Sequence, residues 1–253
     1  MANKLRYFIA NWKMFGNHRS FNVLYSTYKY LAKKKRILKK SRIIFCIPST
    51  LIHNFAFRLK KTPIKIGAQN CHYDEISSSI TGSVNADMLK KAGAEYIIIG
   101  HSENRAQGDT NKIIKNKIKS ALEKNLKIIF CIGESFKDKK NKKTFYILKK
   151  QMRESLLKKF NYKQIIIAYE PIWSIGTGKI PQIKYLIKNL KFIKKEFSGI
   201  FKTKSYPIIL YGGSVNGNNI ALFLPIKELD GFLVGAASRS AKKFIDIIKN
   251  YYK

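Results

Sequence analysis

Short apolar segments recur along this chain of 253 residues and constrain its fold more than any other feature. They lie at residues 5–10, 42–47, 64–68, 96–99, 127–131, 164–169, 207–211 and 231–234. Runs of this length that are rich in apolar or β-branched residues are typical of buried strands. We therefore expect eight strands.

Helix-length segments lie between these runs and carry apolar residues at three- and four-residue spacing. They cover residues 17–34, 110–124, 141–160, 182–197 and 238–251, with Pro181 and Ser238 as candidate helix-start residues. Strands that alternate with helices imply a parallel sheet joined by right-handed crossovers. Eight such units in 253 residues favour a closed (β/α)8 barrel, an α/β fold, over an open doubly wound sheet.

The composition is that of one folded domain, because 45% of the residues are hydrophobic and no linker divides residues 1–253. Residues 1–10 do not resemble a signal peptide, and no apolar run reaches the roughly 18 residues of a membrane span. We therefore expect a soluble, cytoplasmic protein with no membrane contact. Cys46, Cys71 and Cys131 show no CxxC spacing, which argues against a disulfide framework or a zinc site.

The formal net charge of +35 leaves two interpretations open. Basic stretches such as residues 33–36 and 137–143 resemble the electrostatic footprint of an RNA-binding protein. They are spread along the chain, however, and charge runs commonly form a solvated surface. We favour the second interpretation and expect nucleic acid to bind only non-specifically, at low salt. The positive field would also attract a phosphorylated substrate.

One carboxylate stands where α/β proteins place their chemistry. Glu170 follows the apolar run 164–169 and so lies at the carboxyl end of a predicted strand. Pro171 stiffens the start of the next loop, while Gly176 and Gly178 free its end. A base beneath a lid that expels water fits this order of residues, although an ordinary loop after a strand-end Glu fits it too.

Residues 168–179, with the sequence AYEPIWSIGTGK, resemble the flexible-loop signature of the triosephosphate isomerase family. The resemblance extends to other blocks over nearly the whole chain and supports the count of eight strands. It implies a TIM barrel that interconverts dihydroxyacetone phosphate and D-glyceraldehyde 3-phosphate, a step of glycolysis and gluconeogenesis. Such a proton transfer requires no metal or organic cofactor. The chain also lacks the nucleotide-binding patterns GxGxxG after its first strand and GxxxxGK[ST].

The resemblance assigns the catalytic residues. The block 11–14 (NWKM) gives Asn11 a role in orienting substrate and Lys13 a role beside the phosphate and the developing enediolate oxygen. The block 99–105 (IGHSENR) gives His101 the role of a neutral electrophile, and a helix beginning near Ser102 would disfavour its protonation. Glu170 would be the base. A lone His or Lys without this resemblance is more often a structural or solvated residue.

Two glycine-containing turns, at residues 211–215 and 233–238, follow the last two predicted strands, where many barrels bind phosphate through backbone N–H groups. By resemblance, these donors belong to Gly176, Ser214, Gly235 and Ala236. Family members usually have Gly in place of Ala236. An alanine keeps the N–H, so its role requires a negative φ at this position.

The segments 67–71 and 81–82 resemble the loop through which family members insert into a second subunit. The resemblance therefore implies a homodimer in which Thr81 reaches Asn11 and Lys13 of the partner. Ser79, Ser83 and Asn104 depart from the family pattern, as does a shortened segment 106–109, and they weaken this expectation. The block 131–134 (CIGE) completes the match, as structural support.

Two other functions remain alternatives. One is a barrel enzyme that acts on a different sugar phosphate, which a panel of phosphosugars would distinguish. The other is a protein without catalysis that binds nucleic acid through its charge, and intact Asn11, Lys13, His101 and Glu170 argue against it.

Overall fold

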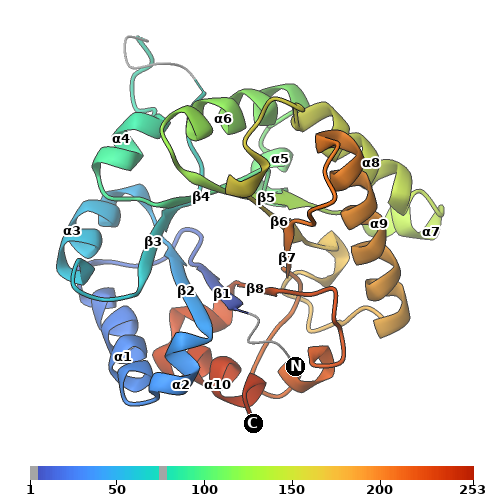
Figure 1. Cartoon of the computed structure of the whole chain (residues 1–253). Helices are drawn as coiled ribbons and strands as arrows, with labels where there is room; N and C mark the ends of the chain where they lie inside the picture. The colour runs from blue at the N-terminus through green and yellow to red at the C-terminus, as the bar shows by residue number, and fades with distance from the viewer. Residues whose placement is uncertain (1–4, 74–78) are drawn as a thin grey trace.

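The computed structural model describes residues 5–73 and 79–253, and within them eight parallel strands close into a barrel. The strands are β1 (Arg6–Asn11), β2 (Ser41–Cys46), β3 (Lys65–Ala68), β4 (Tyr96–Ile99), β5 (Lys127–Ile132), β6 (Ile165–Tyr169), β7 (Ile208–Tyr211) and β8 (Gly231–Val234). Each strand pairs with the next along the chain, and β8 pairs with β1 to complete the closure. Figure 1 shows the strands around the centre and the helices as an outer ring. The predicted (β/α)8 barrel is confirmed.

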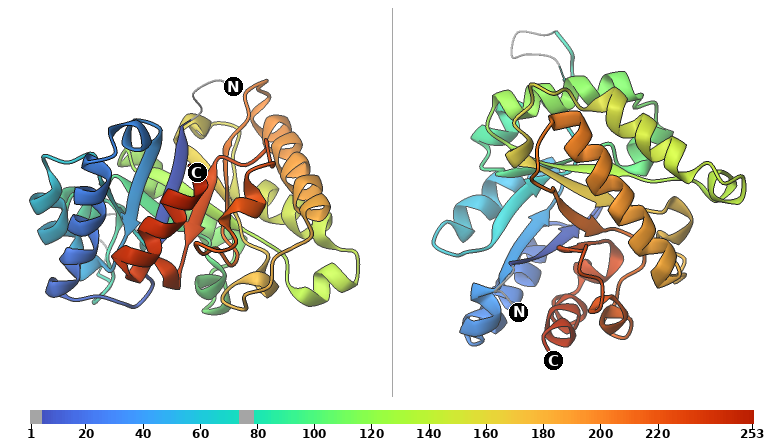
Figure 2. Two further views of the ribbon diagram at one scale, coloured as in Figure 1. Left: turned by 90° about the horizontal axis from the view of Figure 1, so that it is seen from below. Right: turned by 45° about the vertical axis from the view of Figure 1, so that its right-hand side comes forward.

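The helices of the ring follow the strands in chain order. They are α1 (Phe21–Ala32), α2 (Lys35–Lys39), α3 (Ser49–Leu59), α4 (Ala86–Lys91), α5 (Ser102–Ala106), α6 (Asn111–Glu123), α7 (Phe136–Lys140), α8 (Thr144–Ser155), α9 (Ile183–Phe201) and α10 (Ala241–Tyr251). Short 3-10 helices are η1 (His18–Ser20), η2 (Tyr162–Gln164), η3 (Ile172–Ser174), η4 (Ile220–Phe223) and η5 (Ala236–Arg239). The last helix, α10, packs against α1, so the outer ring closes as the sheet does (Figure 2).

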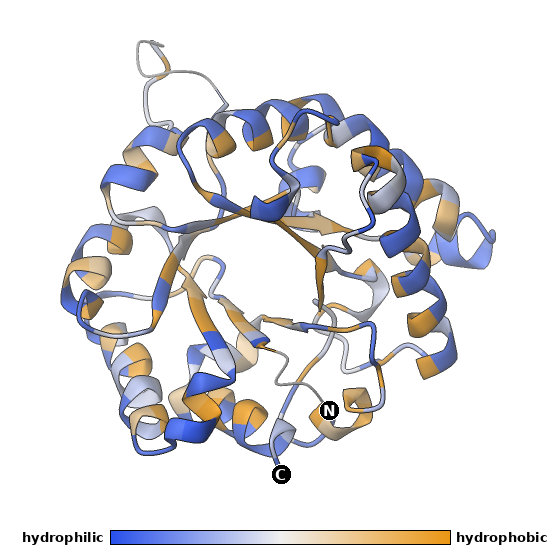
Figure 3. Ribbon diagram, viewed as in Figure 1, coloured by the Kyte–Doolittle hydropathy of each residue, from blue (hydrophilic) through white to orange (hydrophobic). Residues whose placement is uncertain are grey.

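Side chains alternate between two hydrophobic cores along each strand, because successive residues of a strand point to opposite faces. Phe8 and Phe45 point outward and pack in the shell between strands and helices. Ile9 and Ile44, their neighbours, fill the barrel interior. Figure 3 shows the strands as mostly hydrophobic and the helices as mixtures of hydrophobic and hydrophilic residues. Continuous apolar runs are therefore what this barrel requires of its strands.

Several predicted helix boundaries are wrong. The helix expected from Ser238 begins at Ala241, because the Ser240 side chain accepts from the backbone N–H of Lys243 and caps it. The helix expected from Pro181 begins two residues later, at Ile183. The segment predicted as helix over 141–160 contains the shorter α8, since the chain turns extended at Leu156. The helices α2, α3, α4 and α7 were not predicted at all.

The basic stretches lie on the surface, which both interpretations of the charge require. All four residues of 33–36 are exposed, and most of 137–143 are exposed as well. Within the described ranges, no helix has both the length and the apolar character needed to span a membrane.

Candidate active site

Glu170 follows β6, and the strand's alternation turns its side chain towards the barrel axis. Ile166 and Ala168 face the interior, and Glu170 is the next residue of the same parity. The pairing of Tyr169 with Tyr211 brings Gly212 beside Glu170. A Cβ at residue 212 would lie 2.5 Å from Cγ of Glu170, so only glycine leaves room for this carboxylate.

The carboxylate of Glu170 is buried and short of hydrogen-bond donors. Only 3% of the residue is exposed, and its Oε2 has no hydrogen-bond partner. Burial raises the pKa of Glu170, and the opposing influence of His101, the Cys131 thiol and Lys13 does not cancel this effect. A carboxylate with a raised pKa is a stronger base than one in water.

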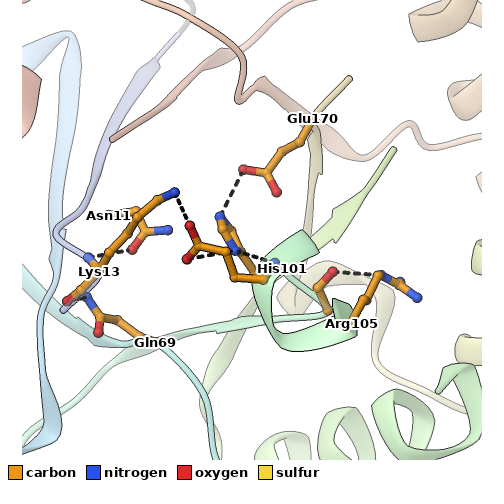
Figure 4. Close-up of polar contacts among 8 residues, drawn as sticks. Asn11, Lys13, Gln69, His101, Arg105 and Glu170 are labelled. Atoms are coloured by element: carbon orange, nitrogen blue, oxygen red, sulfur yellow. Dashed lines mark hydrogen bonds and ion pairs between the residues drawn. The ribbon is translucent and has the colours of Figure 1, made fainter. Parts of the chain in front are cut away.

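His101 stands opposite this carboxylate, at the start of α5, where it occupies the N-cap position. Its Nδ1 accepts a hydrogen bond of 3.2 Å from the backbone N–H of Glu103. A neutral ring in this setting carries its proton on Nε2. That atom lies 3.7 Å from Oε1 of Glu170, as the dashed line in Figure 4 marks. The donor nitrogen of the imidazole therefore faces the same space as the base.

Lys13 reaches the site from the end of β1 through a strained backbone. Its φ of 55° is in the left-handed region, which costs a non-glycine residue about 1–2 kcal/mol. Two contacts hold it there: its N–H donates to Oδ1 of Asn11 at 3.1 Å, and its carbonyl accepts from Nε2 of Gln69 at 2.9 Å. Its Nζ lies 2.5 Å from Oε1 of Glu103 (Figure 4).

One cavity of about 310 Å³ unites the site residues expected from the sequence. Its wall includes Asn11, Lys13, His101, Glu170, Gly176, Ser214, Gly235 and Ala236. Ala236 opens η5 and is not among the four described non-glycine residues with positive φ. The condition attached to alanine at this position is therefore met. A cavity of this volume matches a small ligand.

The loop after Glu170 is fastened to the end of β7. Ser214 Oγ accepts from the N–H of Gly178 at 3.0 Å and donates to the carbonyl of Ser174 at 2.7 Å. Ser174 Oγ is also 2.8 Å from the hydroxyl of Tyr211. Gly176 and Gly178 both have positive φ, which glycine adopts without strain. This segment, called the flap below, therefore lines the cavity with Gly176 and Gly178 and is held to the end of β7 through Ser214.

A second buried carboxylate, Glu134, lies next to this flap. Unlike Glu170, it accepts hydrogen bonds from several side chains. Tyr169 OH donates to both of its oxygens, at 3.2 and 3.0 Å. Trp173 Nε1 and Tyr185 OH donate to Oε1 at 3.0 and 2.9 Å. Since these partners come from β6, η3 and α9, Glu134 ties the start of the flap to the barrel.

Thr81 is the one predicted site residue that does not line the cavity in a single chain, and it is exposed. The segment around it includes residues 74–78, which lie outside the described residues. Ser79, Thr81 and Ser83 follow that gap.

The shortened segment 106–109 is held by a largely buried ion pair. Lys117 Nζ lies 2.7 Å from Oδ1 of Asp109 and donates to Oδ1 of Asn70 at 3.0 Å.

Sequence reasoning gave no individual role to Glu103, Gly212 or Arg239, which lie in this region of the cavity. Glu103 lies two positions after His101 in the motif already singled out, so the motif offered a signal for it. Gly212 belongs to the segment 211–215 and Arg239 directly follows the segment 233–238, but their contacts depend on the closed sheet. Among residues 5–73 and 79–253, no cluster of His, Cys, Asp or Glu has the grouping of a metal site.

The model of the family described as triosephosphate isomerase matches residues 6–251. The chain belongs to the triosephosphate isomerase family. Triosephosphate isomerase of Dictyoglomus thermophilum is 39% identical to this chain over 246 residues, which cover 95% of the chain and 97% of the relative. Triosephosphate isomerase of Thermodesulfovibrio yellowstonii is 37% identical over 248 residues, with coverage of 96% and 98%.

A solved structure agrees with the sequence comparison. Triosephosphate isomerase from Bartonella henselae superimposes with a TM-score of 0.88 at 31% identity, over 98% of this chain and 99% of that one. The resemblance that the sequence motifs indicated is therefore confirmed at the level of family and fold. The nucleic-acid-binding alternative receives no support from these comparisons.

Proposed function

We propose that the protein is an aldose-ketose isomerase that interconverts dihydroxyacetone phosphate and D-glyceraldehyde 3-phosphate through an enediolate. Membership of the triosephosphate isomerase family is the first support. The observation that carries the proposal is the meeting of a donor-poor carboxylate and an imidazole: Glu170 Oε1 lies 3.7 Å from His101 Nε2 at one cavity.

Glu170 acts as the base in this mechanism. It removes a proton from the carbon beside the substrate carbonyl and returns it to the adjacent carbon. Its burial raises its pKa, which brings its basicity closer to what proton abstraction near neutral pH requires. Its unpartnered Oε2 is free of the hydrogen bonds that would stabilise the ionised form.

His101 and Lys13 stabilise the negative charge that forms on the substrate oxygens. Nε2–H of His101 donates to the oxygens of the enediolate, while the Nδ1 contact with Glu103 N–H fixes the ring orientation. Lys13 adds a cation to the same wall, and Asn11 orients the substrate beside it. This division of roles is the one the family resemblance implies.

The phosphate group of the substrate binds in the same cavity, to backbone N–H groups of Gly176, Ser214, Gly235 and Ala236. Backbone donors at turns suit an oxyanion because their geometry is fixed before the ligand arrives. The flap that contains Gly176 is bonded to Ser214, so phosphate binding and flap closure reinforce each other. A closed flap would hold the enediolate long enough to avoid loss of phosphate.

A coupled assay with both triose phosphates tests this function, with larger phosphosugars as the comparison. We expect turnover of the two triose phosphates in both directions and little with the larger compounds, because the cavity is only about 310 Å³. Isomerisation in deuterium oxide should also leave deuterium on carbon in the product. Turnover confined to a larger phosphosugar would replace this proposal with the rival barrel enzyme.

We further propose that the active form is a homodimer. Met14, next to Lys13, is 99% exposed, and Phe15 and Ile80 are also exposed, which leaves these apolar side chains uncovered in one chain. In the dimer, Thr81 of each subunit contacts the partner near Asn11 and Lys13. Analytical ultracentrifugation should give twice the chain mass of 29.2 kDa, and Met14→Glu should lower both mass and activity. A fully active species at the mass of one chain would contradict this.

A glycolytic role in the cytoplasm completes the proposal. The family's reaction belongs to glycolysis, and all three cysteines are free and buried, in keeping with a reducing compartment. Fractionation of the source cell, with the isomerase activity followed through each step, tests the location.

A further inference from the structure

Arg239, the last residue of η5, lines the same cavity as Lys13 and Glu170. Two buried side-chain atoms in the described chain lack a hydrogen-bond partner: Oε2 of Glu170 and Nε of Arg239. One is an acceptor and the other a donor, and both belong to residues of one cavity wall. A buried donor without a partner costs free energy, and this one belongs to the guanidinium group of a residue that lines the cavity.

The position of Arg239 is fixed by its neighbours. Trp12 Nε1 donates to the carbonyl of Ser238 at 3.0 Å, and Ser238 Oγ donates to the carbonyl of Gly235 at 2.7 Å. The guanidinium carbon lies 5.1 Å from the centroid of the Phe15 ring, a cation–π distance. The charge is therefore held at the cavity by an aromatic face, which leaves its N–H donors available for an anion.

The charge balance of the cavity depends on this residue. Glu103 binds Lys13 Nζ at 2.5 Å and so offsets the charge of the lysine before any substrate arrives. Burial would raise the pKa of Glu103, but the hydrogen bond from Lys13 and nearby positive charge, including that of Arg239, lower it and keep the carboxylate ionised. With Glu170 ionised as well, Lys13 alone leaves a net negative charge around the site. The positive charge of Arg239 offsets this net negative charge, which would otherwise repel a phosphate dianion.

We infer that Arg239 is a further substrate-binding residue, whose guanidinium attracts and holds the phosphate group of the triose phosphate. The inference rests on the proposed function, because it assigns a part of that site. The inference also extends the proposed function, since a charged side chain then supplements the backbone donors of Gly235 and Ala236. A planar guanidinium suits phosphate oxygens better than a neutral donor does.

Arg239→Met is the decisive variant, because methionine keeps an unbranched apolar stem against Phe15 and removes the charge. We expect KM for both triose phosphates to rise about tenfold, with kcat within about threefold, since the lost interaction is present in ground and transition states alike. The inhibition constant of inorganic phosphate should rise by a similar factor. Arg239→Lys keeps the cation and should recover most of the affinity.

A matched control separates this local effect from the general field of a chain with net charge +35. Arg153 lies on α8 and pairs with Glu196 of α9, so Arg153→Met removes one positive charge away from the cavity. We expect this variant to keep KM and the phosphate inhibition constant within about 1.5-fold, because surface charges are screened over about 8 Å at physiological salt. An equal rise of KM in Arg153→Met and Arg239→Met would overturn the inference.

Other outcomes separate this inference from the proposed function. If wild-type protein isomerises triose phosphates but Arg239→Met has unchanged KM and phosphate inhibition, the inference fails and the function stands. A loss of kcat with unchanged KM also overturns it, since Arg239 would then act through Glu103 and Lys13. If wild-type protein shows no isomerase activity, the proposed function fails. Calorimetric titration with inorganic phosphate then still tests whether Arg239 holds the anion.

Discussion

Glu134 and Glu170 follow neighbouring strands, and both are buried, with 0% and 3% of each residue exposed. Their surroundings differ in the supply of donors. Three side chains donate to Glu134, from Tyr169, Trp173 and Tyr185. Glu170 has an oxygen with no partner at all. The two buried carboxylates therefore differ in their supply of donors and not in burial, and a shortage of donors is what supports Glu170 as the proposed base.

The direction of each side chain explains this difference. Tyr169 points outward into the shell between strands and helices, where Glu134 meets it together with α9. Glu170, one residue further on, points inward to a cavity. The alternation of β6 thus turns two consecutive residues to opposite sides: Tyr169, a donor to Glu134, and Glu170, the proposed base.

The largest expected effect is that of Glu170→Gln on turnover. Glutamine has the same shape but cannot accept a proton, so kcat should fall by about three decades or more while KM changes little. Steady-state kinetics in the coupled assay measures both constants. Near-normal turnover would remove Glu170 from the role of base and erase the contrast with Glu134.

Gly212→Ala should give the next largest effect, because it displaces the carboxylate of the proposed base, Glu170, without changing its chemistry. The new Cβ would lie 2.5 Å from Cγ and 2.8 Å from Oε1 of Glu170, so the carboxylate must move. A misplaced catalytic group costs about 100-fold in rate. Gly199→Ala in α9 is the control, since its Cβ meets no atom within 4 Å and alanine favours a helix. Equal kcat values for the two variants would contradict this account of Gly212.

Glu134→Gln should act mainly on stability. The amide places donors against Tyr and Trp groups that already donate, so the free energy of unfolding should fall by about 2–4 kcal/mol. Urea denaturation followed by circular dichroism measures this loss. Glu123→Gln, in an exposed pair with Lys119 at 3.7 Å, serves as control and should change stability by less than about 0.5 kcal/mol. If the free energy of unfolding falls no more in Glu134→Gln than in the control, Glu134 does not have the structural role assigned to it.

The smallest effect concerns the stability of Glu170→Gln. Burial raises the folded-state pKa of Glu170 above its unfolded value, so keeping it ionised costs folding free energy at pH values above the folded pKa. The variant avoids that cost, and its Tm at neutral pH should exceed that of wild type by roughly 2–5 °C. The gap should begin to narrow as the pH falls to the folded pKa, where Glu170 becomes protonated, and should vanish below the unfolded pKa. A Tm difference that widens in acid would mean that the pKa of Glu170 is lowered on folding, which would contradict this account.

The sequence predicted most of the fold, because strands buried on both faces must be continuous apolar runs. All eight runs overlap the observed strands to within two residues at each end. The short helices α4 and α7 escaped prediction because five or six residues are too few to show helical periodicity. Ser238 was mistaken for a helix start because its hydroxyl bonds the carbonyl of Gly235, a contact that η5 creates and the sequence does not reveal.

The site was predicted where motifs carried it and missed where contacts across the barrel created it. Glu170, His101 and Lys13 stand in motifs specific enough to be recognised along the chain. The closeness of Gly212 to Glu170 depends on the register of β6 against β7, and the position of Arg239 depends on closure of the sheet. These distances follow from the barrel geometry, which local sequence does not encode.

The most direct test of the contrast between the two carboxylates compares kcat of Glu170→Gln and Glu134→Gln at one temperature where both proteins are folded. We predict that turnover by Glu134→Gln stays within about tenfold of wild type, since a structural residue acts through folding. Turnover by Glu170→Gln should be at least about 100-fold lower than that. Equal losses in the two variants, or a greater loss in Glu134→Gln, would contradict the account.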